Sequence, residues 1–289
     1  MNAFCLIMAM TFSATTTVGG RLYNARVQKY ENVSGLYTTL VPCFGALGWL
    51  CIWITDLSFD IRVIPYSLLY GLFYISFTVG MLFALKYGST SLTGLVKQIS
   101  LVGVSIWGFA FWATPFSYVA IVGIILTVAA LVLCLLKREE GSDNYDVRRW
   151  MLYITLVAVG NAGCSITQRY QQIAFNYEYK NGFMFFAILF TALVCLLFAV
   201  NEKKNNWDSA IREAWWCPAI TGLSGAFSNV FIFLMIRDNM SSSVIYPGIA
   251  VGGLMITTLI SYSFFKERLR PLQWVGLAVG AAALVLLNL

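Results

Sequence analysis

The chain ends with the stretch SSSVIYPGIAVGGLMITTLISYSFFKERLRPLQWVGLAVGAAALVLLNL, residues 241–289, in which two apolar runs flank a short polar break. Residues 91–137 repeat this layout when the two stretches are offset by 153 residues. Gly123 then aligns with Gly276, and the pentapeptide AALVL that begins at Ala129 recurs at the same offset. Self-similarity at a long, fixed period is the signature of an internal repeat. The sequence therefore predicts two related halves.

The composition predicts a membrane protein. Hydrophobic residues make up 59% of the chain and charged residues 11%, whereas a soluble domain carries roughly 25% charged residues. Residues 33–55, 116–136 and 182–200 contain no charge at all, and about 20 apolar residues cross a hydrocarbon core. We expect an integral multi-pass protein of the cell or inner membrane, in contact with the lipid bilayer and without a separate soluble domain.

The apolar runs predict an all-α fold with ten transmembrane helices. Helices are expected because lipid requires every backbone polar group to be paired within its own segment. The predicted spans are residues 4–20, 33–55, 63–85, 89–112, 116–136, 150–167, 182–200, 214–236, 243–265 and 272–289.

The spans divide into a first repeat at 1–137, a charged connecting loop at 138–149 and a second repeat at 150–289. Because each repeat has an odd number of spans, the second enters the bilayer from the opposite side. The expected arrangement is an inverted-topology repeat.

The Lys and Arg residues predict the orientation of the chain. The loops after the odd-numbered spans hold fourteen of them and the opposite loops hold four, namely Arg62, Arg169, Lys180 and Arg237. Cytoplasmic loops are enriched in Lys and Arg. This count places both termini outside the cytoplasm. It also explains the net charge of +6 without a nucleic-acid partner.

Two segments resemble a known family of transporters. Phe265-Lys266-Glu267-Arg268-Leu269, followed by a final apolar helix, is similar to the repeat ending of the EamA-like branch of the drug/metabolite transporter superfamily. Residues 84–93 (ALKYGSTSLT) are similar to that family's passage from span three to span four. The first repeat departs from the family pattern because Thr114 stands where a second glutamate is usual.

The resemblance implies a secondary transporter. Its central cavity would be lined by spans one to four and six to nine, with spans five and ten packed away from it. It also implies cytoplasmic termini, which contradicts the orientation that the charge count predicts.

Lys97 is the strongest candidate for substrate binding. It is the one Lys, Arg, Asp or Glu expected deep inside a span, and a charge in that position is costly and commonly functional. Thr90, Thr93, Lys97 and Ser100 recur at helical spacing and therefore share a face. Lys97 could face the cavity and hold an anionic or electron-rich group. Alternatively, it could pair with backbone carbonyls and be purely structural.

Five further residues are candidate cavity residues, each with a structural alternative. Asn161 and Gln168 share a face of span six, and Asn229 lies in span eight; such amides could bind a hydroxylated substrate or join helices to one another. Tyr74 is deep enough in span three to line a cavity. Tyr246 precedes Pro247 and Gly248, which could interrupt span nine as transport sites often do or lie harmlessly in its first turn.

Other patterns exclude several functions. The chain has no histidine, and its seven cysteines lack paired spacing, so neither a metal site nor a disulfide framework is expected. No cofactor or catalytic motif is present, which indicates that the protein is not an enzyme. The pairs Gly248/Gly252 and Gly276/Gly280 have the Gly-x-x-x-Gly spacing of close helix packing.

The sequence predicts a transporter, functional as a monomer, that moves a small neutral or anionic metabolite by alternating access. The spans contain no Asp or Glu, which disfavours a proton-coupled exporter of cations. The alternatives are a proton-coupled exporter of drugs or amino acids and a membrane scaffold without transport activity.

Overall fold

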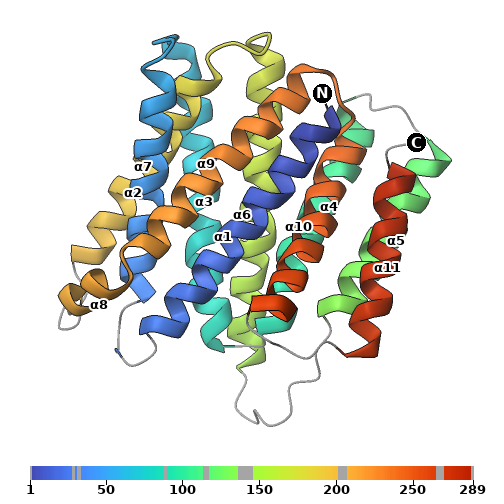
Figure 1. Cartoon of the computed structure of the whole chain (residues 1–289). Helices are drawn as coiled ribbons and strands as arrows, with labels where there is room; N and C mark the ends of the chain where they lie inside the picture. The colour runs from blue at the N-terminus through green and yellow to red at the C-terminus, as the bar shows by residue number, and fades with distance from the viewer. Residues whose placement is uncertain are drawn as a thin grey trace.

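The computed structural model describes residues 2–27, 30, 34–87, 90–112, 117–135, 146–200, 207–264 and 270–287. These ranges form a bundle of eleven α-helices and one 3-10 helix (Figure 1). In chain order the elements are α1 (Asn2–Val27), α2 (Ser34–Trp53), η1 (Ile61–Val63), α3 (Ile64–Tyr87), α4 (Thr90–Phe111), α5 (Tyr118–Leu135), α6 (Val147–Ala174), α7 (Lys180–Val200), α8 (Trp207–Ala214), α9 (Trp216–Arg237), α10 (Ser242–Phe264) and α11 (Pro271–Leu287).

Each apolar run predicted as a span coincides with one long helix, while two short elements were not predicted. These are η1, capped by the Asp60 carboxylate on the backbone N–H of Arg62, and the amphipathic helix α8, which buries Ala210 and Ala214. By length and composition, eight of the long helices can cross a membrane, while α5 and α11 are shorter apolar helices. Large apolar side chains such as Leu197 and Phe264 are exposed on the bundle, as expected of a surface in contact with lipid.

The sixth span was predicted too short: it ends at Ala174 instead of residue 167, because its polar final turns remain helical. Of the two interpretations of Pro247, the structure favours the one without an interruption, since α10 is continuous from Ser242 to Phe264. The proline stands near the start of α10, where its missing N–H removes a single helical hydrogen bond.

The helices pack in a reciprocal pattern. Helix α3 packs on α6 as α1 packs on α9, and α2 packs on both α7 and α9 while α7 packs on both α2 and α3. Helix α4 packs on α10, and α5 packs on α11 at one edge of the bundle (Figure 1). The start of α1 and the end of α11 lie at the same end of the bundle (Figure 1).

Glycines allow the closest of these approaches. A Cβ atom on Gly160 of α6 would lie 2.5 Å from the backbone nitrogen of Phe77 on α3. In the α5–α11 pair, a Cβ on Gly276 would lie 2.6 Å from Cys134 Sγ. The other glycines of the two Gly-x-x-x-Gly pairs also face neighbouring side chains, with Gly248 against Leu6, Gly252 against Met10 and Gly280 against Val251.

Candidate substrate-binding site

Lys97 lies in the first half of α4, where that helix packs between α6 and α10. Its Nζ atom is 5.6 Å from the ring centroid of Phe77 on α3. Within the described residues it forms no ion pair, and the long helices contain neither Asp nor Glu. The face of an aromatic ring attracts a cation, so Phe77 is the electrostatic partner that the structure gives to this ammonium group.

Asn161 and Thr93 join α6 to α4. Asn161 Nδ2 donates to the carbonyl oxygen of Lys97 at 2.9 Å and to Ser100 Oγ at 2.8 Å. Thr93 is completely buried, and its Oγ1 accepts a hydrogen bond of 3.2 Å from Trp150 Nε1. The two donor hydrogens of the Asn161 amide are therefore engaged between helices, and its carbonyl oxygen is the group that could still bind a solute.

Tyr74 and Asn229 lie at different distances from Lys97. The ring of Tyr74 is 6.1 Å from that of Phe77, so one aromatic ring separates it from the Lys97 ammonium. Asn229 Nδ2 donates to the carbonyl of Gly225 in its own helix at 2.9 Å, and within the described residues its side chain makes no hydrogen bond to Lys97. The structure thus groups Lys97, Thr93, Asn161 and Tyr74 around the α3–α4–α6 contact.

Gln168 lies near the end of α6, and Tyr246 on α10 contacts the same part of that helix. They are 2% and 1% exposed, and the Tyr246 hydroxyl donates to the carbonyl of Ser165 at 3.4 Å. Arg169 follows Gln168 in α6, is near enough to Tyr246 to influence it electrostatically, and lies 5.7 Å from the ring centroid of Trp112. Arg169 was expected to be a loop residue, because the predicted span ended two residues before it. The amide-rich sequence around Arg169 was the signal that could have identified it.

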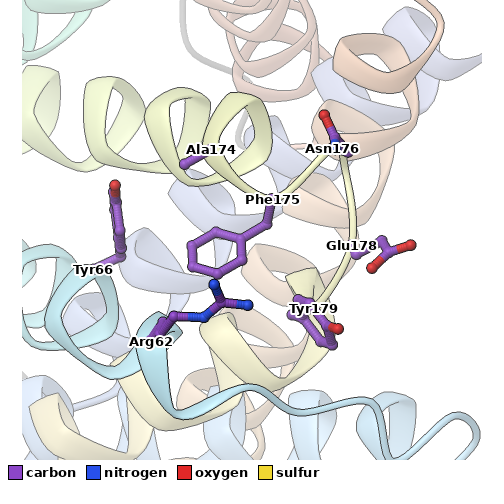
Figure 2. Close-up of a pocket in the computed structure, with 7 residues that line it drawn as sticks. All are labelled: Arg62, Tyr66, Ala174, Phe175, Asn176, Glu178 and Tyr179. Carbon is purple, nitrogen blue, oxygen red and sulfur yellow. The ribbon is translucent and has the colours of Figure 1, made fainter.

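A surface pocket of about 440 Å³ opens at this same end of the bundle. It is formed by the start of α3 and the turn between α6 and α7, as Figure 2 shows. The Arg62 guanidinium points at the ring of Phe175, 6.0 Å from its centroid. Hydrogen bonds from Arg62 hold the pKa of the Asp60 carboxyl below its ordinary value. The pocket is lined by Arg62, Tyr66, Ala174, Phe175, Asn176, Glu178 and Tyr179; Lys97 is not among its residues, and the predicted central cavity stays a prediction.

Long apolar helices with buried polar and cationic side chains between them define a multi-pass integral membrane protein. Comparison with known families gives the class more closely. Residues 148–289 match the EamA-like transporter family, so the second half of the chain is similar to that family. The match confirms the predicted resemblance, although Glu267 and Thr114, which bear on it, lie outside the described residues.

Two further proteins are similar over most of the chain. An uncharacterised protein of Haemophilus influenzae is 22% identical over 254 residues, which cover 86% of this chain and 81% of that protein. A solved crystal structure superimposes with a TM-score of 0.75 over 99% of this chain and 95% of the other, at 14% identity. At that identity the structural likeness shows the fold alone.

Proposed function

We propose that this chain is a secondary transporter that moves a small neutral or anionic metabolite by alternating access. The observation that carries the proposal is a helical protein similar to a transporter family, with a half-buried cation, Lys97, inside the bundle and no acidic side chain in its described long helices. A cation held in lipid at a cost is commonly part of a substrate pathway. In this proposal Lys97 and Phe77 form one wall of the binding site, with Tyr74, Thr93 and Asn161 beside them.

The reciprocal packing supports two inverted repeats, 1–137 and 150–289. The offset of 153 residues places α4 (Thr90–Phe111) over α10 (Ser242–Phe264) and α5 (Tyr118–Leu135) over α11 (Pro271–Leu287). If α1 corresponds to α6 and α3 to α9, the α3–α6 contact becomes the α1–α9 contact, and both are present. Repeats of this kind place the substrate at their interface and alternate access by rocking against each other.

The absence of acidic residues from the long helices argues for transport without a proton. Proton-coupled carriers commonly use Asp, Glu or His in their membrane segments. The chain has no histidine, and its Asp and Glu residues within the described ranges lie at Asp56, Asp60, Asp146, Glu178, Asp208, Glu213 and Asp238, at helix ends, in turns or in α8. Uniport or exchange of the metabolite fits this distribution.

Uptake by purified protein in liposomes tests the proposal. Vesicles preloaded with one solute are given the same labelled solute outside, using lactate, succinate, alanine and glucose as probes. We expect saturable counterflow of at least one probe without an imposed pH gradient. Because Lys97 contacts the solute in this proposal, Lys97→Ala should reduce uptake at low solute concentration at least about tenfold, a loss of about 1.4 kcal/mol.

Two control variants accompany Lys97→Ala. Lys97→Arg keeps the charge and should retain part of the uptake, whereas Lys180→Ala removes a cation at the start of α7 and should leave uptake unchanged. Equal uptake by Lys97→Ala and the wild type would contradict the role of Lys97. A strict requirement for a pH gradient would contradict transport without a proton.

A further inference from the structure

The end of α6 carries buried polar atoms that have no hydrogen-bond partner within the described residues. Four of the side chains involved gather at one place: Arg169 through Nε and Nη1, Gln168 through Nε2, Gln172 through Oε1 and Trp112 through Nε1. Three of these side chains supply donors, and one of the three is a permanent cation. Buried donors in folded proteins are almost always paired, whereas these three have no acceptor among the described residues and Gln172 Oε1 accepts no hydrogen bond from them.

Gln172 links the side chains that α6 contributes. It lies three residues after Arg169 and four after Gln168, the two spacings at which helix side chains are neighbours. The Arg169 guanidinium carbon lies 5.7 Å from the Trp112 ring on α4, and Arg169 also interacts with Tyr246 on α10. The cluster therefore lies where α4, α6 and α10 meet, roughly 12 Å along α6 from Asn161 at 1.5 Å per residue.

The Arg169 charge is not balanced by the protein around it. None of the ion pairs among the described residues includes Arg169. The acidic residues at this end have other surroundings: Asp238 pairs with Arg237 at 3.7 Å, and Glu178 is exposed and points outward (Figure 2). An aromatic face supports the guanidinium plane but leaves its N–H groups free to bind an anion.

We propose that this cluster is an entry subsite, which binds the carboxylate group of the transported metabolite before the metabolite reaches Lys97, roughly 12 Å farther along α6. Arg169 supplies the charge, Trp112 and Gln168 supply further N–H donors, and the Gln172 oxygen can accept a hydrogen bond from a hydroxyl or ammonium group beside the carboxylate. Carboxylates are bound strongly by guanidinium through charge-assisted hydrogen bonds. The subsite rests on the proposed transport function and narrows its substrate to an organic acid or amino acid.

Thermal unfolding of the purified protein in lipid nanodiscs tests the subsite. The probes are acetate, lactate and succinate, each compared with acetamide, lactamide or succinamide at the same concentration and ionic strength. We expect at least one carboxylate to raise the melting temperature by about 3 °C at a concentration well above its Kd, whereas the matched amide leaves it unchanged. The shift should fall below about 1 °C in Arg169→Gln and be partly retained in Arg169→Lys.

Arg21→Gln is the matched control, because Arg21 holds the corresponding position in the first half and is hydrogen-bonded to Ser261. It should keep the full carboxylate shift. Unliganded Arg169→Gln should melt within about 2 °C of the wild type, since removing an unpaired buried charge costs little. A larger fall, an equal shift with the amides, or a carboxylate shift that survives in Arg169→Gln would overturn the subsite.

The uptake assay separates this proposal from the transport function. Uptake of glucose without any carboxylate shift would overturn the subsite and leave a transporter. A carboxylate shift that is lost in Arg169→Gln, with no uptake of the same carboxylate, would support the anion site and contradict transport.

Discussion

Arg21 in the first half and Arg169 in the second stand six and five residues before the ends of α1 and α6, yet their surroundings differ. Arg21 Nη1 donates to the hydroxyl of Ser261 on α10. Arg169 has no such partner among the described residues, and the residue of α4 that aligns with Ser261 at the offset of 153 is Gly108. A glycine has no hydroxyl to offer. Two helices of similar sequence position can thus differ in the hydrogen bonding of their arginines, which is the difference on which the proposed anion subsite depends.

The largest expected difference between the two halves is in stability, when a glycine is replaced at the α3–α6 contact or at the α1–α9 contact. A Cβ on Gly160 would meet the backbone of Phe77 at 2.5 Å and of Phe73 at 2.6 Å, whereas one on Gly19 would meet the side chain of Thr221. A backbone cannot rotate away but a threonine side chain can. Gly160→Ala should therefore destabilise the protein by about 3 kcal/mol and Gly19→Ala by about 1 kcal/mol, the range found for overpacked cores.

Unfolding of both glycine variants in mixed micelles with increasing SDS measures this difference. Gly103→Ala is the control, because a Cβ there has no neighbour within 4 Å, and its stability should match that of the wild type. Equal losses for Gly160→Ala and Gly19→Ala would show that the two helix pairs are packed alike.

An intermediate effect is expected for the two asparagines. Asn161 bonds across helices to Lys97 and Ser100, while Asn229 bonds within its own helix to Gly225. Asn161→Leu should cost about 1–2 kcal/mol, because it leaves buried acceptors unpaired. Asn229→Leu should cost less than about 0.5 kcal/mol, since removing its side chain leaves the helix's own hydrogen bonds intact. The same SDS titration compares them, and a larger loss for Asn229→Leu would reverse this assignment.

The smallest effect concerns the arginines themselves. A double-mutant cycle of Arg21→Gln and Ser261→Ala should give a coupling of about 0.6 kcal/mol, which is typical of polar contacts between membrane helices. The cycle of Arg169→Gln with Gly108→Ala should give none, because Gly108 has no side chain that can pair with arginine. Coupling below the measurement error in the first cycle would mean that the Arg21–Ser261 hydrogen bond does not stabilise the fold.

The helices could be predicted because apolar length is a local property. Charge-free runs such as 182–200 reappear as α7 (Lys180–Val200) with shifts of no more than two residues. The end of α6 could not be predicted in this way, since the polar residues from Arg169 to Gln172 look like a loop in the sequence, although they continue the helix. Helix α8 escaped notice for a similar reason: its eight residues are polar on average, and only packing against the bundle makes a helix of them.

The candidate site also has features that the sequence could predict and features that only the structure shows. Lys97 could be identified from the sequence, because a single charge inside an apolar run is visible without any partner. The proximity of Lys97, Phe77 and Tyr74 could not be predicted from the sequence. Lys97 lies on α4 and the two rings lie on α3, and the three side chains meet only through contacts with the Phe77 ring. The amide of Asn161 was open to two interpretations until its contacts with α4 were known.

By itself the sequence determined the membrane class and the helical segments, and it predicted a duplication, because hydropathy, length and self-similarity are properties of the chain before it folds. Only the tertiary structure decided which polar side chains are paired and which are not. Arg21 and Arg169 are the same residue type in corresponding segments, and their difference arises from what the opposite helix presents to them. Pairing depends on contacts between residues far apart in the sequence, such as Arg21 and Ser261, which are 240 positions apart, and no local pattern encodes such contacts.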